Sequence, residues 1–379
     1  VDSGATVDVS GIADYRLPMS VHLVDVPRLG LNELADSPVQ REGVLRGASI
    51  VVDARLSGTR EDGVAWVGTP LANVNGYVQQ VPRRVGQLLQ DGGRINLAGN
   101  EVITRSGAQL LLDGGYVHYL GGVLETTRLV ASNGAIVDVG EADPQTAYAG
   151  IAGVFSTEQP RWNSASTFRD PVLGAAGGVF EPAYIEGGDA GRLSVFGQSA
   201  VLLNGGMSAR AVAGRRQLAS GVLPLGGSFV AGSGTLRSQA FPDTSALVAG
   251  PSYVLQDAVP TIESLYGDFD AKSSRALSTR SLSDPDNVDR WVPISTRALA
   301  AGGFGSLTVQ AGGSTDGGEV LVREGQGLDL GRGGSVSLTG SRVRVQADIL
   351  AAGGSIRIVG TGNTGVVGSS VRPTASAAP

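Results

Sequence analysis

The sequence predicts an all-β fold, a β-solenoid with surface insertions. Three observations predict it: a glycine-rich composition, paired glycines that recur at short intervals, and apolar residues that alternate with polar ones after these pairs. Of the 379 residues 58 are glycine, whereas aromatic residues make up 5% and charged residues 17%. Ordinary domains carry about 7% glycine and about 25% charged residues. The chain is therefore dense in tight turns and small side chains.

The paired glycines set the period of the repeat. Eight of the pairs begin at positions 92, 187, 205, 226, 302, 317, 333 and 353, and among these neighbouring pairs within a cluster lie 15 to 21 residues apart. This interval is too short for a unit that contains two helices, such as a tetratricopeptide or ankyrin repeat. It fits one turn of a solenoid built from three short strands and three bends. Glycine suits the bends because the backbone turns sharply there and leaves no room for a Cβ.

Alternating apolar residues follow the glycine pairs. Val336 and Leu338 follow one pair, and Ile356 and Ile358 follow the next at the same offset. The same pattern recurs in Ile95 with Leu97, Leu193 with Val195, and Leu307 with Val309. Because successive side chains of a strand point to opposite faces, we expect these residues to point inward and to stack on one another.

A second phrase also recurs. It reads SGATVDVSG at residues 3–11, SGAQLLLDGG at 106–115 and NGAIVDVGE at 133–141, and we expect its copies to form another side of the solenoid. A flexible glycine-rich linker would not show strict apolar alternation between its glycines. A β-sandwich stays open as an alternative, because it too contains short alternating strands with frequent turns, although it does not predict stacked phrases.

The repeat and its interruptions divide the chain into eight segments. Solenoid turns are expected at residues 1–11 (a partial turn), 92–115, 187–236 and 301–360. The segments between them are predicted as an insertion-rich β region (12–91), an aromatic-rich insertion (116–186) and an extrahelical insertion with acidic and proline residues (237–300), and the end as a flexible tail (361–379). Insertions leave a solenoid through its bends and lie on its surface, where binding functions concentrate.

Charge and cysteine content exclude several classes of function. The net charge of −6 gives no basic field for nucleic acid or an anionic membrane. The absence of cysteine excludes disulfides, thiolate metal sites and cysteine nucleophiles. No run approaches the roughly 18 apolar residues of a membrane span, and the start VDSGATVDVS is not a signal peptide. It begins in mid-pattern, so we expect the chain to be a segment of a longer protein.

Three stretches carry a resemblance to a known family. They are QREGVLRGASIVVDARLSGT and the residues after it to GGRINL (40–97), LDGGYVHYLGGVLETTRLVASNG and the residues after it to GVF (112–155), and EPAYIEGGDAGRLSVFG (181–197). Over about residues 36–215 the chain resembles the filamentous-haemagglutinin-like large exoproteins of Gram-negative bacteria, in particular a distal region with a domain of unknown function.

The resemblance implies a right-handed parallel β-helix at the cell surface and a non-catalytic adhesin or extracellular filament with a role in cell adhesion or biofilm. It also implies two-partner (type V) secretion through an outer-membrane β-barrel transporter. The family's secretion domain is not visible in this sequence, so the export route follows from the resemblance alone. The family supplies no catalytic residues that could be carried over to this region.

The acidic loop is the candidate metal site. LSDPDNVDR places Asp284, Asp286 and Asp289 close together, and GDFD adds Asp268 and Asp270. Clustered carboxylates can bind Ca²⁺, but Pro285 interrupts the EF-hand pattern and its central Gly and final Glu are missing. A solvated acidic loop is the alternative. Apart from this calcium candidate we expect no cofactor.

Other residues or motifs that could indicate catalysis or metal binding lack the neighbouring residues or structure that such sites need. His22 and His118 stand alone, which argues against zinc. GGFG at 302–305 precedes a strand rather than a helix, which argues against a phosphate loop, and no GxSxG motif occurs. Glu186 and Asp189 could form a carboxylate pair for glycan chemistry, but their position beside a predicted bend favours a turn role.

The aromatic-rich insertion is the candidate ligand surface. Its aromatic residues are Tyr116, Tyr119, Tyr148, Trp162, Phe168 and Tyr184. Of these, Tyr116, Tyr119, Trp162 and Phe168 are the candidates for a surface that stacks on sugar rings or docks on a receptor. The alternative is a small core that holds the insertion together.

Two functional classes remain open. The first is a secreted adhesin or structural fibre that binds a host or bacterial surface glycan or protein, or self-associates end to end or laterally. The second is a β-helix enzyme or binding protein for polysaccharides, since the fold does not decide between them. The sequence shows no stacked row of carboxylates with Arg or Lys, so the first class is favoured.

Overall fold

The computed structural model describes residues 1–159, 164–169, 178–232, 234–240, 251–266, 284–312 and 318–362. It is mostly β, with 41% of residues in strands and 13% in helices, as the sequence predicts for its class. The chain divides into two compact units. Unit 1 comprises Val1–Asp14, Leu89–Tyr116 and Glu186–Pro379, and unit 2 comprises Tyr15–Leu88 and Val117–Ile185.

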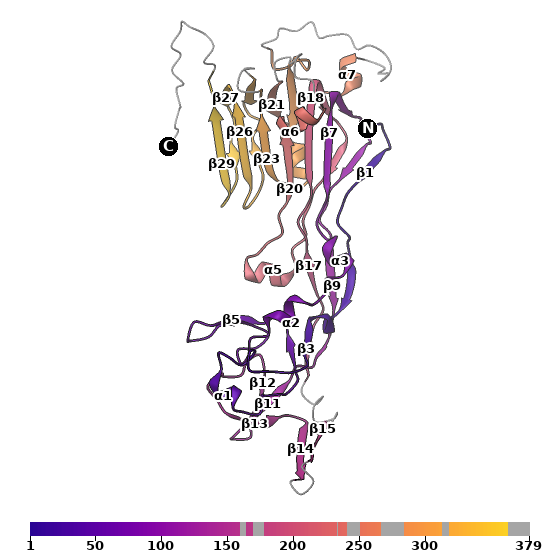
Figure 1. Ribbon diagram of the computed structural model, residues 1–379. Helices are drawn as coiled ribbons and strands as arrows, with labels where there is room; N and C mark the ends of the chain where they lie inside the picture. Colours follow the sequence, from indigo (N-terminus) through magenta and orange to yellow (C-terminus); the bar gives the residue numbers. More distant parts are fainter. Residues whose placement is uncertain are drawn as a thin grey trace. The chain divides into compact units, whose positions relative to one another are not determined.

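The largest sheet of unit 1 has six strands, all parallel, in the order β29-β26-β23-β20-β18-β7 (Figure 1). Its strands are β7 (Arg94–Thr104), β18 (Arg192–Leu203), β20 (Gly227–Ala231), β23 (Phe304–Gln310), β26 (Ser335–Gly340) and β29 (Ser355–Gly360). Sheet order and chain order agree throughout, so each strand lies beside the next strand of this sheet along the chain.

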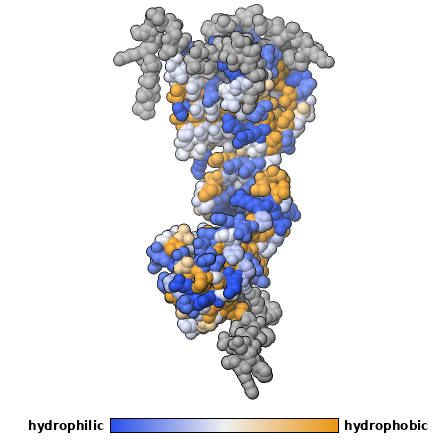
Figure 2. All heavy atoms as spheres, viewed as in Figure 1, coloured by the Kyte–Doolittle hydropathy of each residue, from blue (hydrophilic) through white to orange (hydrophobic). Residues whose placement is uncertain are grey.

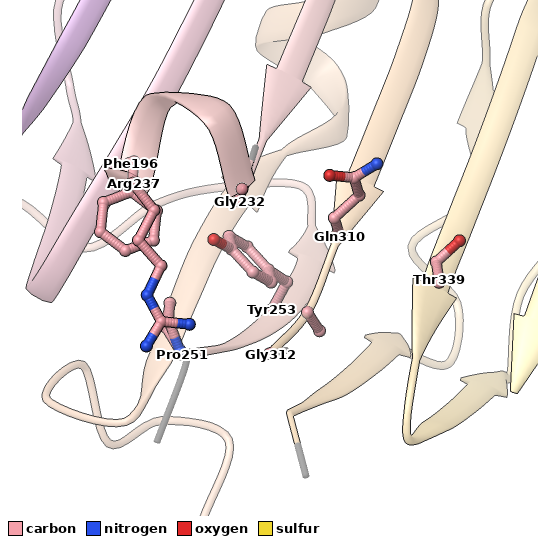
Figure 3. A pocket seen from close by; sticks show the side chains of 10 residues that line it. Phe196, Gly232, Arg237, Pro251, Tyr253, Gln310, Gly312 and Thr339 are labelled. Carbon is pink, nitrogen blue, oxygen red and sulfur yellow. The ribbon is translucent and has the colours of Figure 1, made fainter. Parts of the chain in front are cut away.

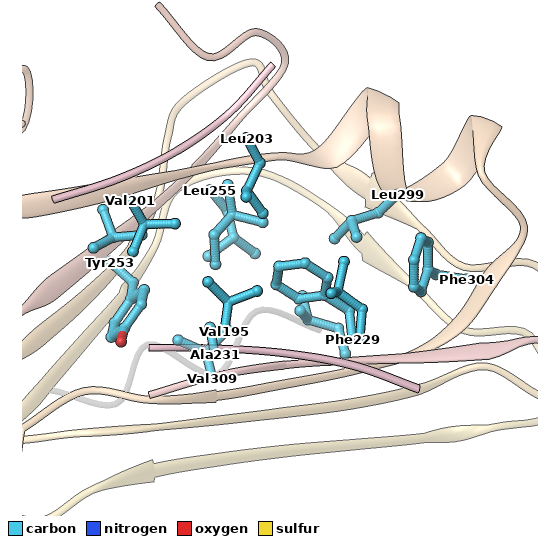
Figure 4. Close-up of a cluster of buried hydrophobic side chains, with 14 of the residues drawn as sticks. Val195, Val201, Leu203, Phe229, Ala231, Tyr253, Leu255, Leu299, Phe304 and Val309 are labelled. Atoms are coloured by element: carbon cyan, nitrogen blue, oxygen red, sulfur yellow. The ribbon is translucent and has the colours of Figure 1, made fainter. Parts of the chain in front are cut away.

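The register of this sheet confirms the predicted stacking of apolar residues. One column of paired residues contains Ile95, Leu193, Phe229, Leu307, Val336 and Ile356. A second column contains Leu97, Val195, Ala231, Val309, Leu338 and Ile358. Residues two apart share a face of a strand, so both columns form one wall of the core. Figure 4 shows Val195, Ala231 and Val309 in the same interior as Tyr253 and Leu255.

Shorter parallel sheets complete the core of unit 1. One has the order β22-β21-β24-β27, with β21 (Ser252–Gln256), β22 (Trp291–Ser295), β24 (Glu319–Val322) and β27 (Arg342–Val345). The others are β1-β8-β19, with β1 (Thr6–Asp8), β8 (Gln109–Leu111) and β19 (Gly206–Ser208), and the pair β25 (Leu328–Asp329) with β28 (Ile349–Leu350). Helix α8 (Thr296–Ala301) contributes Leu299 to the same core.

The second recurring phrase is confirmed in two copies and wrong in the third. Thr6 pairs with Gln109 in the parallel pair β1 and β8, as the alignment predicts. The third copy instead forms β12 (Ile136–Asp138), antiparallel to β11 (Arg128–Ala131) in unit 2. All three copies turn at a glycine with positive φ, namely Gly4, Gly107 and Gly134. What differs is the residue before it, because the third copy has Asn-Gly, a preferred turn of β-hairpins, where the other two have Ser-Gly.

The expectation that residues 237–300 lie outside the core is wrong for β21, β22 and α8. All five residues of β21 are buried, and the strand lies between β22 and β24 although it precedes β22 in the chain. A strand that is buried on both faces shows no apolar–polar alternation, and no glycine pair precedes SYVLQ. The two sequence signals used to find turns of the repeat therefore both miss it.

Unit 2 consists mainly of antiparallel pairs around a separate core that includes Val26, Leu29, Leu34, Leu45 and Leu129. The antiparallel pairs are β3 (Leu23–Val26) with β4 (Ile50–Asp53), β5 (Ser57–Thr59) with β6 (Ala65–Val67), β10 (Gly122–Leu124) with β16 (Val179–Glu181), β11 with β12 and β13 (Tyr148–Ile151), and β14 (Val154–Gln159) with β15 (Ser164–Arg169). The two segments expected as separate insertions, 12–91 and 116–186, supply all of unit 2 and fold together.

The remaining elements are one sheet and several short helices. The sheet has the order β17-β9-β2, with β17 (Tyr184–Gly187), β9 (Tyr116–Leu120) and β2 (Tyr15–Pro18). The helices are η1 (Met19–His22), α1 (Pro38–Arg41), α2 (Asn75–Gln79), α3 (Val85–Leu88), α5 (Arg215–Ser220), α6 (Gly234–Ala240) and α7 (Ile262–Tyr266). None of the helices in the described ranges is long and apolar enough to span a bilayer. The expected tail lies outside the described residues from position 363 onward.

Candidate functional site

A network of charged and aromatic side chains lies inside unit 2. Arg55, just after β4, donates from Nη2 to Asp53 Oδ2 at 2.5 Å and to Glu181 Oε2 at 2.6 Å. Its Nε also donates to Asp53 Oδ1 at 2.9 Å, so the Asp53 carboxylate binds the guanidinium through both oxygens. Planar guanidinium and carboxylate groups match in this arrangement, which gives short charge-assisted hydrogen bonds.

Aromatic rings extend the same network. Arg55 Nη1 lies 3.4 Å from the Tyr184 hydroxyl, which is 2.9 Å from His22 Nε2. The Tyr119 ring stacks on Tyr184 with centroids 4.8 Å apart and lies 4.5 Å from the His22 ring. The network therefore joins η1, β4, β9, β16 and β17, which come from widely separated parts of the chain.

The electrostatics of the network favour its ionised form. Burial by itself raises the pKa of Asp53, but hydrogen bonds from the Arg55 side chain and backbone and the positive charge of Arg55 outweigh it, so the pKa lies below its usual value. Burial by itself lowers the pKa of Arg55, and the hydrogen bonds to Asp53 and Tyr184 more than reverse this. Asp53 and Glu181 therefore both bind Arg55, and the network holds β4 and β16 together.

The predicted aromatic ligand surface lies partly in a small core and partly outside the described residues. Tyr119 is 4% exposed and belongs to a small core with Leu17, Met19 and Val117, so its assignment to an exposed surface is wrong. The reason is the ring stack with His22 and Tyr184, which favours the alternative of a small core. Tyr116 is partly buried on β9. Trp162 and the side chain of Phe168 lie outside the described residues.

The acidic loop does not form a metal site among the described residues. Asp286 Oδ1 accepts a hydrogen bond from Arg323 Nη2 at 2.7 Å, and Asp284 Oδ1 accepts one from the Asp286 backbone N–H at 2.9 Å. Over the described ranges no three His, Asp or Glu side chains are grouped so that they could hold a metal ion, Asp284, Asp286 and Asp289 included. Asp268 and Asp270 lie outside the described residues.

The turn role predicted for Asp189 is confirmed. Its Oδ1 accepts the Leu225 backbone N–H at 2.7 Å, and its own backbone N–H donates to Asp91 Oδ1 at 2.9 Å. The Asp189 carboxylate thus caps the Leu225 N–H, just before β20. Glu186 is exposed on β17.

Two exposed apolar surfaces were not predicted from the sequence. The first surface lies in unit 1. It consists of Leu218 of α5 and of Val222, Leu223 and Leu225 in the loop after this helix. Gln217 holds α5 in place, because its amide accepts the Gly187 N–H and donates to the Gly187 carbonyl. Figure 2 shows apolar surface at the level of α5. Exposed apolar groups of this kind mark interaction surfaces.

The second apolar surface lies in unit 2 on the pair β10 and β16. Val123 pairs with Phe180, which is 65% exposed, and Val179 beside it is also exposed. Sequence reasoning missed both surfaces because it looked for alternation and aromatic clusters. The signal for the first was a run of apolar residues without alternation, GVLPL at 221–225, next to the arginine pair 215–216.

Strand β29 is an edge of the six-stranded sheet. Its residues Ile356 and Ile358 pair with Val336 and Leu338, which are buried, but are themselves 48% exposed. At the opposite edge, Ile95 of β7 is 5% exposed. Within the described ranges the two edges therefore differ, because both inward residues of β29 are half-exposed whereas Ile95 of β7 is buried.

Comparison of the chain with protein-family models, with curated proteins and with solved structures finds no match.

Proposed function

We propose that the chain is a non-catalytic segment of a secreted surface adhesin or extracellular fibre, and that the parallel sheets of unit 1 wind as a right-handed β-helix. The observation that carries the proposal is the β29 edge with its half-exposed Ile356 and Ile358. An edge strand presents unpaired backbone N–H and C=O groups and acts as a template for a further strand. Covering it with another strand of the same kind extends the sheet.

The proposed contact is between unlike edges of two copies. A head-to-tail contact would place β29 of one copy beside β7 of the next and continue both apolar columns. Contacts between unlike surfaces generate open filaments when they do not close into a ring. Such a filament presents unit 2 and the apolar surface of α5 once per copy, as an adhesive fibre requires.

Secretion and location are part of the same proposal. The resemblance over about residues 36–215 supports a filamentous-haemagglutinin-like exoprotein, exported by an outer-membrane β-barrel transporter and held at the Gram-negative cell surface. We propose a surface glycan or protein of a host or bacterial cell as its partner. The proposal needs neither a metal nor a cofactor.

Sedimentation of an Ile356→Lys/Ile358→Lys variant tests the proposal. The original chain is expected to form larger species as its concentration rises, because each added copy buries the exposed isoleucines. The variant places two charges on the contact and is expected to stay monomeric at the same concentrations. The matched control is Leu218→Lys/Leu223→Lys, which places two charges on the apolar surface of α5 and should still associate.

The outcomes separate the explanations. Association that persists in the β29 variant and disappears in the α5 variant would place the contact at α5 and overturn the end-to-end fibre. A chain that stays monomeric at every concentration would overturn self-association altogether. Far-ultraviolet circular dichroism of each variant shows whether its strands are retained.

A further inference from the structure

The apolar residues of α5 and of the loop after it form one exposed surface of unit 1, the α5 surface. Leu218 of α5 is 61% exposed, and Val222, Leu223 and Leu225 of the loop are 73%, 50% and 66% exposed. Figure 2 shows orange apolar surface at the level of α5, next to blue hydrophilic surface. Large apolar side chains that gather on a surface in this way mark a place where a partner docks.

Hydrogen bonds hold the α5 surface in place. Gln217 Oε1 accepts the Gly187 N–H at 2.9 Å, and Gln217 Nε2 donates to the Gly187 carbonyl at 2.8 Å. At the end of the loop, Asp189 Oδ1 accepts the Leu225 N–H at 2.7 Å, and the Ala190 N–H donates to the Leu225 carbonyl at 2.9 Å. Helix and loop are therefore both tied to the segment that leads into β18, and the fold holds the four apolar side chains outward.

The α5 surface differs from the cavity of unit 1 that Figure 3 shows. That cavity has a volume of about 190 Å³, and Phe196, Tyr253 and Gln310 are among its lining residues. The Tyr253 hydroxyl is buried, and the backbone at Gly232 packs closely against the Gln310 carbonyl. A large partner cannot enter such an interior, whereas it can cover the α5 surface from outside.

The charge along this part of the chain is positive, although the whole chain carries a net charge of −6. Arg215 and Arg216 begin α5 and are both exposed. From position 190 to position 242 the sequence contains five arginines and no acidic residue. Glu186 and Asp189 lie on the segment that holds α5, and the Asp189 carboxylate is used by the Leu225 N–H. The net charge of the whole chain, which argues against an anionic membrane, therefore does not describe this segment.

The same combination of residues recurs in unit 2. The arginine pair 83–84 stands before α3, and Val85 and Leu88 of this helix are 68% and 59% exposed. Gln87 accepts a backbone N–H at the start of α3 at 2.9 Å, as Gln217 does at the start of α5. An arginine pair, a capping glutamine and exposed apolar residues thus occur together twice. Core packing requires none of these exposed side chains, so the recurrence favours a role in binding.

We propose that the α5 surface docks on a lipid bilayer that contains anionic headgroups. Leu218, Val222 and Leu225 enter the boundary between headgroups and acyl chains, and Arg215 lies among the headgroups. Burial of apolar side chains and attraction to anionic lipid together determine the strength of interfacial binding. A bilayer is favoured over an acidic polypeptide because it takes up protruding apolar side chains, whereas a protein partner must match their shape. The proposal does not rest on the proposed fibre, since the α5 surface lies within one copy of unit 1.

Flotation of the full chain with phospholipid vesicles tests the proposal. The chain is expected to bind vesicles of phosphatidylcholine mixed with phosphatidylglycerol, and to bind vesicles of phosphatidylcholine alone far more weakly. Arg215→Gln is expected to weaken binding to the mixed vesicles about fivefold, which corresponds to about 1 kcal/mol for an arginine near an anionic surface. Arg215→Gln/Leu218→Gln also removes an inserted apolar side chain and is expected to weaken binding by more than about tenfold.

The matched control is Arg332→Gln/Leu350→Gln, which removes one exposed arginine and one exposed leucine from another part of unit 1. It should bind the mixed vesicles as the original chain does. An Ile356→Gln/Ile358→Gln variant removes the apolar residues of the β29 edge and should also keep its binding to vesicles. Failure of the fibre and failure of the docking surface are therefore separate results.

Four outcomes would overturn the proposal. Absence of binding to the mixed vesicles would exclude a lipid partner, and equal binding to both kinds of vesicle would exclude the role of the arginine. A loss in the control as large as that in the Arg215→Gln/Leu218→Gln variant would place the contact elsewhere. Binding of polyglutamate without binding of vesicles would assign the α5 surface to an acidic polypeptide.

Discussion

An Arg55→Ala variant is expected to lower the free energy of unfolding of unit 2 by about 3–5 kcal/mol, the usual cost of removing one partner from a buried ion pair. Arg55 binds Asp53 and Glu181, and the side chains of all three residues are largely buried. Without the guanidinium, two carboxylates face each other in a poorly solvated interior. The loss is therefore far greater than that of an exposed pair.

Urea unfolding followed by hydrogen–deuterium exchange of peptides from unit 2 measures this effect. The matched control is Arg46→Ala, which breaks an exposed pair with Glu42 in the same unit. Exposed pairs contribute about 0–1 kcal/mol, so the control should unfold almost as the original chain does. An Arg55→Ala variant as stable as this control would contradict the structural role of the network.

The same network predicts a dependence on pH. The pKa of Asp53 in the folded state lies below the ordinary value of 3.8, so ionised Asp53 stabilises the fold above that value. This stabilisation is lost as the pH falls through the folded pKa. An Asp53→Asn variant should therefore show a weaker loss of stability on acidification than the original chain. A loss of the same steepness in both would assign the acid sensitivity to other carboxylates.

A Leu307→Ala variant is expected to lower the free energy of unfolding of unit 1 by about 2–5 kcal/mol. Leu307 is fully buried at the centre of its column, between Phe229 and Val336. Truncation of Leu307 leaves a cavity. The strands on both sides, β20 and β26, are held by backbone hydrogen bonds to β23 and cannot move in to fill it. Leu307 should therefore fall toward the upper end of that range.

Two variants calibrate this result within the same sheet. Ile356→Ala removes a half-exposed residue from the same column and should cost clearly less, because solvent already reaches the site. Thr308→Ala changes the neighbouring residue of β23, which points to the other face, and should cost least. Exchange of unit 1 peptides in urea provides the measurement. Equal losses for Leu307→Ala and Ile356→Ala would contradict the distinction between an interior and an edge strand.

The sequence predicted the six-stranded sheet well because local rules govern it. Period-two alternation after glycine pairs marks Leu193, Leu307 and Val336 as inward residues, and the register places all three in one column. The same rules fail where other interactions decide. The hairpin at Asn133 and Gly134 follows turn chemistry, and β21 is buried on both faces, so neither matches the expected pattern.

The candidate sites were less accessible to sequence reasoning. The network around Arg55 joins residues separated by up to 162 positions, from His22 to Tyr184, and only tertiary packing brings them together. The sequence shows the aromatic content of residues 116–186, but burial of Tyr119 depends on partners from η1 and β17 that no local pattern reveals.

Electron microscopy of the purified chain at neutral pH, over a range of concentrations, tests the central claim most directly. The account predicts rods of uniform width whose length grows with concentration, and their disappearance in the Ile356→Lys/Ile358→Lys variant. Separate particles of constant size at every concentration, in the original chain and the variant alike, would contradict a fibre that extends through the β29 edge.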